Sequence, residues 1–402
     1  MKWSFNIQLK RKEQSRCVEL VSYFLLNFPL ERQRLEEHVQ LIVKNITHYE
    51  HETGRMGGLK LLTSILNRFP AELIDHFCDL FFITLCLVLQ NDDSNQVKKE
   101  TAKVLGTLFT KLTKSKFSTT VVSFMNKWFD HPKSLALACQ LAGLLPNKQL
   151  FHEKLLQVVA EVRDDDNALY QALVALERAL TNDAVDVERV PDLKALLLYE
   201  DLWVRQVCSR MVSSRLEAHG QLDGIEGFDL VLVLVDQLDS DQISDELAPL
   251  VLHNLVLIIQ ACKPAWFRGK NEIPLAWMIN KLCYIASRPE PLDLGLKNRR
   301  RRVVFQFFHA VFTQSHMGMD DKLVKAVVKT LNVIHVSGLE RLDPLAELKD
   351  QIVELMKQSI GVEALAAAMG KDKKFKTERR REKRAQRDVE RVMPTKRIKR
   401  NV

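Results

Sequence analysis

The stretch DDKLVKAVVKTLNVI, residues 320–334, carries the clearest structural signal in this 402-residue chain. Six of its apolar residues recur three or four positions apart, and lysines and an asparagine fill the opposite face. On a helix with 3.6 residues per turn, this spacing places the apolar side chains on one face. The stretch therefore predicts an amphipathic helix that packs against a core. The apolar residues are Leu323, Val324, Val327, Val328, Leu331 and Ile334.

The same period recurs along the chain and predicts an all-α fold. Residues 166–180 predict a second helix, with Asp166 as its N-cap. The run VLVLV at 231–235 resembles a buried strand, but no second strand can pair with it, so we expect a helix. Turn-forming residues interrupt the pattern every 15 to 25 residues, and the chain has only 14 glycines and 12 prolines. These features exclude collagen-like and loop-rich β folds.

Internal similarities predict a repeat of helix pairs. The dipeptide Phe-Pro occurs at 28–29 and at 69–70, which are 41 residues apart. HEAT repeats are helix pairs of about 40 residues that stack into a solenoid. Segments 91–105 and 200–211 share an acidic residue, Asp93 or Asp201, followed after a short gap by Val and a base. We expect such charges to pair between neighbouring repeats. The sequence predicts a HEAT-like α-solenoid of about nine helix pairs over residues 1–370.

The net charge of +8 is concentrated at the C-terminal end. Residues 371–402 contain 15 basic and 5 acidic residues, whereas residues 1–370 contain 44 basic and 46 acidic residues. This tail has few core-forming residues, so we expect it to be disordered, or helical once bound. Its charge favours RNA phosphate contact or nuclear targeting over a merely solubilising role. The residues predicted to act in this way are Lys371, Lys373, Lys374, Lys376, Arg379, Arg380, Arg381, Lys383, Arg384, Arg387, Lys396, Arg397, Lys399 and Arg400.

A second basic block consists of Arg299, Arg300, Arg301 and Arg302. Four consecutive helical residues point nearly all round the helix axis, so this block cannot form one patch. Two roles stay open for it. The pattern favours a solvated, partly ion-paired face, and a secondary contact with RNA backbone is the other role.

The sequence lacks the common catalytic and cofactor motifs, including a phosphate-binding loop, GxGxxG and GxSxG. The segment HETGR at 51–55 begins like the zinc motif HExxH, but Arg55 replaces the second histidine. His48 and His51 could face a metal, yet no third or fourth ligand can be named. We interpret the segment as a polar helix–helix corner in which Thr53 caps the following helix. We predict no enzyme, no metal and no cofactor.

The cysteines and the apolar runs indicate the cellular compartment of the protein. The first residues lack the apolar segment of a signal peptide, and no run reaches the roughly 20 apolar residues of a membrane span. We expect a soluble intracellular protein without a membrane or small-molecule partner. The scattered cysteines form no CxxC pair, and we expect reduced, buried thiols. They are Cys17, Cys78, Cys86, Cys139, Cys208, Cys262 and Cys283.

Several segments resemble one known family. YEHETGR at 49–55, LFFITLCL at 80–87, NDDS at 91–94, PLAWMINKL at 274–282 and the basic tail resemble the C-terminal region of the small-subunit processome component 20 family. The first of these segments is the most specific, and we interpret it as a structural corner that marks the family. Its residues are Tyr49, Glu50, His51, Glu52, Thr53, Gly54 and Arg55.

The resemblance implies a nucleolar HEAT-type scaffold that supports processing of the precursor to small-subunit rRNA and is not itself an enzyme. It implies pre-rRNA or box C/D small nucleolar RNA as the partner of the tail, and other processome proteins along the solenoid. The chain is far shorter than the family, and residues 263–273 are short where the family carries an acidic insertion. Residues 13–28 already form an ordinary amphipathic pattern without a polar capping repeat before them, as in a C-terminal piece of a longer protein. A HEAT-type transport receptor or a phosphatase-type scaffold, with protein partners only, is the alternative, although neither explains the basic tail.

Overall fold

The structure is a computed structural model, and its described residues are mostly helical. These residues contain the helices α1 to α18, a further helical segment at 362–369, one π-helix and no strand, so the predicted all-α, HEAT-like solenoid is confirmed. The chain divides into two compact units, Met1–Asp192 (unit 1) and Leu193–Val402 (unit 2), which are described separately. The structure describes residues 11–28, 30–180, 190, 193–219, 224–261, 275–288, 294–313, 321–333, 344–369 and 384.

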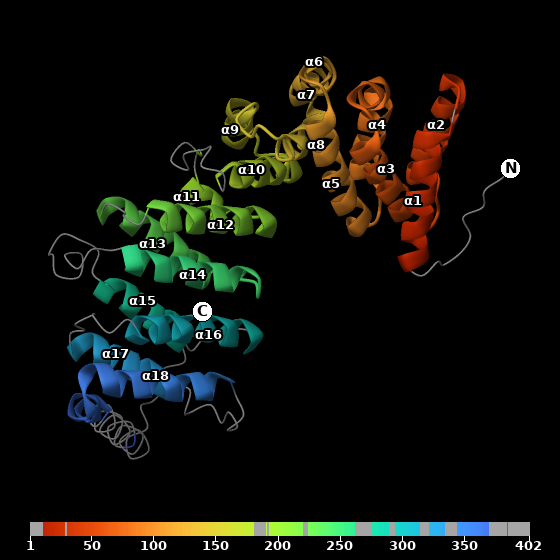
Figure 1. Cartoon of the computed structure of the whole chain (residues 1–402). Helices are drawn as coiled ribbons and strands as arrows, with labels where there is room; N and C mark the ends of the chain where they lie inside the picture. Colours follow the sequence, from red (N-terminus) through yellow and green to blue (C-terminus); the bar gives the residue numbers. More distant parts are fainter. Residues whose placement is uncertain are drawn as a thin grey trace, which may run out of the picture. The chain divides into compact units, whose positions relative to one another are not determined.

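Unit 1 is a stack of helix pairs. Its elements are α1 (Arg11–Asn27), α2 (Arg32–His48), α3 (Glu52–Arg68), α4 (Ala71–Asn91), α5 (Asn95–Lys111), α6 (Lys114–Lys116), the π-helix η1 (Phe117–Val122), α7 (Ser123–Phe129), α8 (Pro132–Ala142), α9 (His152–Glu161) and α10 (Asp166–Leu180). Helices α2 and α3, α4 and α5, α7 and α8, and α9 and α10 pack as pairs. Successive pairs stack because α1, α3 and α5 lie side by side in one layer and α2 and α4 in the other (Figure 1).

Helix α4 lies at the centre of the core of unit 1. Its sequence is apolar on most sides, and accordingly it packs against α2, α5 and η1. Phe81 and Phe82 are fully buried. The ring of Phe82 stacks on Trp128 of α7, with 5.5 Å between the ring centroids. Burial of such aromatic side chains supplies much of the apolar area that holds a helical repeat together.

Unit 2 is built in the same way. Its elements are α11 (Leu193–Leu196), α12 (Leu202–His219), α13 (Gly224–Asp239), α14 (Leu247–Ala261), α15 (Leu275–Ser287), α16 (Leu294–Thr313), α17 (Asp321–Val333) and α18 (Pro344–Ile360). Helices α12, α14, α16 and α18 follow one another in one layer, and α13, α15 and α17 form the other (Figure 1). Gly361 follows α18 with φ of 85°, a backbone conformation that favours glycine at a helix end.

Buried polar groups also fasten helices of unit 2 to their neighbours. The amide of Asn254 on α14 is fully buried, donates to the carbonyl of Ser209 at 2.9 Å and accepts from the hydroxyl of Ser213 at 2.6 Å. Gln237 on α13, also fully buried, donates to the carbonyl of Leu197 at 2.7 Å. Because buried polar groups are costly when unpaired, these bonds fix how the helices meet.

The structure confirms the helices predicted from the apolar period. Residues 321–333 form α17, and the predicted apolar stripe is buried at Val324, Val327, Val328 and Leu331. Residues 231–235 lie within α13, so the helical interpretation of the VLVLV run is confirmed.

Two predicted N-caps are wrong. Asp165 caps α10, since its Oδ1 accepts from the backbone N–H of Ala168 at 2.9 Å, and Asp166 is already the first helical residue. Thr53 lies inside α3. The N-cap of this helix is His51, whose side chain makes no capping hydrogen bond. Each cap lies one or two residues before the predicted position, because a cap depends on where the preceding chain enters the helix.

The predicted charge pairing between repeats involves other residues than those expected. Asp201 caps α12, because its Oδ1 accepts from the backbone N–H of Val204 at 2.9 Å. In unit 1 the link between successive helix pairs joins Arg55 of α3 to Asp92, which precedes α5. The acid and the base thus lie in different repeats, as expected, but Asp93 is not the acid of this pair.

The division at Asp192 falls inside the range predicted as one solenoid. The predicted boundary between residues 370 and 371 lies outside the described residues, so it stays a prediction. None of the helices in the described part of the chain is long and apolar enough to cross a membrane. Among the described cysteines, Cys17 is half-buried. Buried thiols are confirmed at Cys78, Cys86, Cys139, Cys208 and Cys283.

Candidate nucleic-acid interface

The basic tail lies almost entirely outside the described residues. Of the 14 tail residues predicted to bind nucleic acid or direct nuclear import, the structure describes Arg384, which is helical and exposed. The proposed role of the tail therefore remains a prediction from its charge of +10. The interface must be sought first among the basic residues that the structure does describe.

Arg299 binds the connection between α13 and α14. Its Nε lies 2.7 Å from Oδ1 of Asp245, and its Nη2 lies 2.9 Å from Oδ2 of the same carboxylate. Its Nη1 donates to the carbonyl of Ile243 at 2.9 Å. This forked contact lowers the pKa of the Asp245 carboxyl, chiefly through the hydrogen bond from Arg299. The predicted ion-paired role is therefore found at Arg299.

Arg300 and Arg301 extend inward from α16 to the ends of two other helices. Arg300 is 1% exposed and donates to the carbonyls of Leu238 and Asp239 at the end of α13. Arg301 is 4% exposed, and its Nε donates to the carbonyl of Ala286 at 3.1 Å near the end of α15. Burial lowers the pKa of Arg301. The last carbonyls of a helix have no partner within it and carry partial negative charge, so guanidinium groups stabilise them.

Arg300 also pairs with Asp241 at 3.1 Å, so the ion-paired part of the prediction is found there, whereas the solvated face and the RNA contact are wrong for Arg300 and Arg301. Because these two side chains are buried, they form neither a solvated face nor a contact for RNA phosphates. Arg302 is exposed on α16. We call Arg299, Arg300 and Arg301 the arginine clasp, because together they fasten α16 to α13, to the 243–245 connection and to α15.

The signature corner at 49–55 is a structural joint between α2 and α3. Arg55 donates from Nη1 to the carbonyls of Tyr49 at 2.9 Å and Glu50 at 3.0 Å, after the end of α2. Its Nε lies 2.7 Å from Oδ2 of Asp92. The other Asp92 oxygen accepts from the backbone N–H of Ser94 at 2.8 Å. The corner therefore ties the turn after α2 to the turn before α5.

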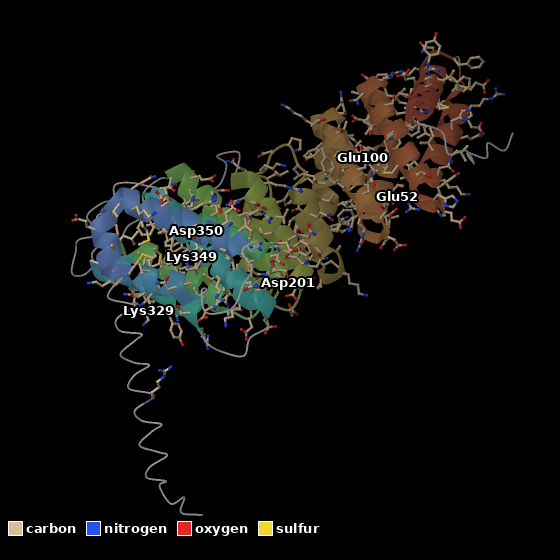
Figure 2. All side chains as sticks on the ribbon, turned by 90° about the horizontal axis from the view of Figure 1, so that it is seen from below. Glu52, Glu100, Asp201, Lys329, Lys349 and Asp350 are labelled. Carbon is tan, nitrogen blue, oxygen red and sulfur yellow. The ribbon has the colours of Figure 1, made fainter. Side chains whose placement is uncertain are left out.

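Gly54 belongs to this corner for a steric reason. A Cβ atom on residue 54 would lie 2.0 Å from Cδ1 of Tyr49, so the tyrosine ring occupies the space that a side chain would need. Glu52, which begins α3 in unit 1, is labelled in Figure 2. The corner at 49–55 thus combines the tyrosine ring, the glycine that leaves room for it and the arginine that binds the turn.

The two histidines considered as metal ligands make local contacts. Nδ1 of His48 lies 3.2 Å from the carbonyl of Lys44 one turn earlier. His51 packs edge-on against the ring of Tyr49, with 6.3 Å between centroids. Within the described part of the chain, no three His, Cys, Asp or Glu side chains gather in a group that could hold a metal ion.

An apolar surface lies on α1 in unit 1. Leu20 is 72% exposed, Tyr23 66% and Phe28 56%. The rings of Phe24 and Phe28 stack with 5.0 Å between centroids. Apolar side chains that gather in this way commonly mark contacts with protein partners.

The sequence reasoning missed a cluster of Lys281 and Tyr284 on α15 and Arg288 just after it, called here the Tyr284 cluster. Tyr284 is 55% exposed. Nζ of Lys281 lies 5.7 Å from the ring centroid, and Cζ of Arg288 lies 6.0 Å from it. Both cations also contact Asp239, at 3.6 and 3.3 Å. The spacing of three and four residues around the tyrosine is visible in the sequence, but the exposure of the ring follows only from the fold.

The fold is that of a HEAT-like α-solenoid, a class of helical-repeat proteins. A crystal structure of importin beta is similar with a TM-score of 0.57 and 11% identity, covering 90% of this chain and 46% of that chain. Residues 204–402 match the family described as small subunit processome component 20 homolog, C-terminal. Residues 204–402 therefore carry the C-terminal domain of the small-subunit processome component 20 family, as the resemblance predicted.

A full-length relative agrees with this assignment. The U3 small nucleolar RNA-associated protein 20 of Schizosaccharomyces pombe is 22% identical over 426 aligned residues, which cover 94% of this chain. The chain spans only 17% of the length of that relative.

Proposed function

We propose that the chain is a non-catalytic scaffold of the small-subunit processome, the early small-subunit pre-ribosome. There it would support processing of the precursor to small-subunit rRNA and act in the nucleolus. The match of residues 204–402 to the processome family carries this proposal. The name of the fission-yeast relative, which refers to the U3 small nucleolar RNA, supports it.

The polar clusters of the body support a scaffold role. The guanidinium groups of Arg55 and Arg300 each bind carbonyls and a carboxylate of the fold itself, so they stabilise helix junctions. Protein partners would bind along exposed surfaces of the two units. The exposed apolar side chains of α1 fit such a partner, which we propose is another processome protein.

The tail would supply the RNA contact. Its 15 basic residues can neutralise phosphates of pre-rRNA or of a box C/D small nucleolar RNA and release counterions. Such binding depends on phosphates and not on base identity, so it is tolerant of sequence and sensitive to salt. Clusters such as Arg379, Arg380 and Arg381 also suit nuclear import.

Nucleolar localisation tests the tail directly. A fluorescent fusion of the full chain should accumulate in the nucleolus, whereas a fusion that lacks 371–402 should lose that accumulation. If the shortened chain remained nucleolar and still cross-linked to pre-rRNA, the role proposed for the tail would be wrong.

Co-purification distinguishes the scaffold from the alternative class. Tagged full chain isolated from cells should bring down processome proteins together with pre-rRNA. A transport receptor would instead bring down a transport GTPase, and a phosphatase scaffold would bring down phosphatase subunits. The second pattern would overturn the proposed function. The likeness to importin beta does not favour it, because a similarity at 11% identity describes the fold alone.

A further inference from the structure

The Tyr284 cluster continues onto the neighbouring helix of the same layer. Helix α17 packs beside α15, and the hydroxyl of Ser287 lies 3.5 Å from that of Thr330. Lys329, next to Thr330 in the chain, is exposed and lies at the lower edge of unit 2 in Figure 2. Burial raises the pKa of Cys283, the residue before Tyr284, and the ammonium group of Lys329 partly opposes that rise.

Several cations gather on this surface. Lys281, Arg288 and Lys329 supply three cations, and Lys325 lies one turn before Lys329 on α17. Asp239 is the carboxylate that contacts Lys281 and Arg288, and its side chain is only 19% exposed. These closely spaced cations can attract an anionic ligand.

We propose that the Tyr284 cluster and Lys329 form a binding site for single-stranded RNA. A base stacks on the ring of Tyr284, and the adjoining phosphates contact Lys281, Arg288 and Lys329. The combination favours RNA because bases stack on an exposed aromatic ring while flanking cations bind the backbone. An acidic protein segment would use the cations but would have no group that needs the ring. The proposal rests on the proposed function in taking RNA as the ligand, but it uses none of the tail residues.

Lysine acetylation of the full chain can test this site residue by residue. A single-stranded uridine oligonucleotide is added in increasing amounts, and labelling of each lysine is measured by mass spectrometry. The RNA should protect Lys281 and Lys329 from acetylation. Lys349 on α18, in the other layer, should keep its labelling (Figure 2). Protection of the tail lysines is read in the same sample, so it reports separately on the tail.

Substitutions at Tyr284 separate stacking from charge. Tyr284→Ala should raise the RNA concentration for half-protection of Lys281 and Lys329 about tenfold, because stacking on an aromatic ring contributes roughly that factor. Tyr284→Phe keeps the ring and should protect as the parent chain does. Because Tyr284 is exposed, the thermal unfolding of both variants should match that of the parent chain, which excludes misfolding as the cause.

Three results would overturn the proposal. Lys281 and Lys329 could stay unprotected while the tail lysines are protected, which would leave the tail as the RNA contact. Tyr284→Ala and Tyr284→Phe could behave alike, which would exclude stacking. A glutamate peptide of equal charge could protect the two lysines as well as RNA does, which would indicate an acidic protein partner. Protection at the cluster without protection of the tail would support this site and count against the RNA contact proposed for the tail.

Discussion

The guanidinium of Arg55 on α3 lies 2.7 Å from the carboxylate of Asp92, measured from Nε to Oδ2, and the two side chains are only 14% and 6% exposed. Arg55 also binds the carbonyls of Tyr49 and Glu50 in the turn after α2. One arginine therefore fastens two successive helix pairs of unit 1. The segment 49–55, predicted from sequence to mark the family, thus forms part of a joint between two repeats.

Removal of Arg55 should destabilise unit 1. Arg55→Met leaves the buried carboxylate of Asp92 without its cation, and breaking a buried pair in this way costs about 3 kcal/mol. Urea unfolding of the variant should show this loss as a lower midpoint. Lys103→Met is the matched control, since Lys103 is 64% exposed and its pair with Glu100 contributes about 0.3 kcal/mol. Equal midpoints for the two variants would contradict the role given to Arg55.

Two nearby glycines should respond in opposite ways to alanine. Gly54→Ala should destabilise the fold by about 1–3 kcal/mol, because its Cβ would meet the ring of Tyr49 at 2.0 Å. A Cβ on Gly57, also in α3, would meet no atom within 4 Å, so Gly57→Ala should stabilise the helix by up to about 1 kcal/mol. Thermal unfolding distinguishes the two. If Gly54→Ala were neutral, the ring would not be what selects glycine.

The arginine clasp makes a similar prediction within one block of sequence. Arg300→Met leaves the buried carbonyls of Leu238 and Asp239 without their donor, at a cost of about 3 kcal/mol. Arg302→Met changes an exposed residue and should stay within about 0.5 kcal/mol of the parent chain. Chemical unfolding of the two variants provides the comparison. A loss at Arg302 as large as that at Arg300 would count against the clasp.

The buried thiols should make stability fall at alkaline pH. Burial raises the pKa of Cys78 and of Cys139 from 9.0 to about 12, and that of Cys283 to about 11. Above pH 9 these thiols ionise in the unfolded chain but stay protonated in the folded one, so unfolding releases protons and stability decreases as the pH rises. Urea unfolding between pH 8 and pH 10 measures the slope.

Alkylation gives an independent check on the same thiols. Cys17 is half-buried and should react first with iodoacetamide, while the buried thiols should react only after denaturation. Mass spectrometry of the labelled peptides identifies each site. Rapid labelling of Cys139 in the native chain would contradict its burial.

The local features of the fold follow from the sequence, whereas the side-chain junctions do not. The helix at 321–333 was predictable because the spacing of its apolar residues is a local pattern within one short stretch of sequence. The burial of Arg300 was not predictable, because the carbonyls that it binds lie about 60 residues earlier in the chain. They come close to Arg300 only when the helix layers stack. The exposure of Tyr284 likewise depends on which face of α15 its neighbours leave open. The resemblance singled out the segment 49–55, but the contact of Arg55 with Asp92 emerged only from the fold.

The tail remains the part of the candidate interface that rests on charge alone, and its RNA contact can be measured directly. The full chain and a chain ending at residue 370 are cross-linked in cells, and the bound RNA is recovered and sequenced. Purified protein is then tested for binding of the same RNA at two salt concentrations. Pre-rRNA should be enriched with the full chain and strongly reduced without the tail. If about six phosphates of a single strand are neutralised, affinity should fall roughly 300-fold between about 50 and 200 mM salt. Equal pre-rRNA recovery by both chains, with binding insensitive to salt, would contradict the proposal that the tail holds the RNA.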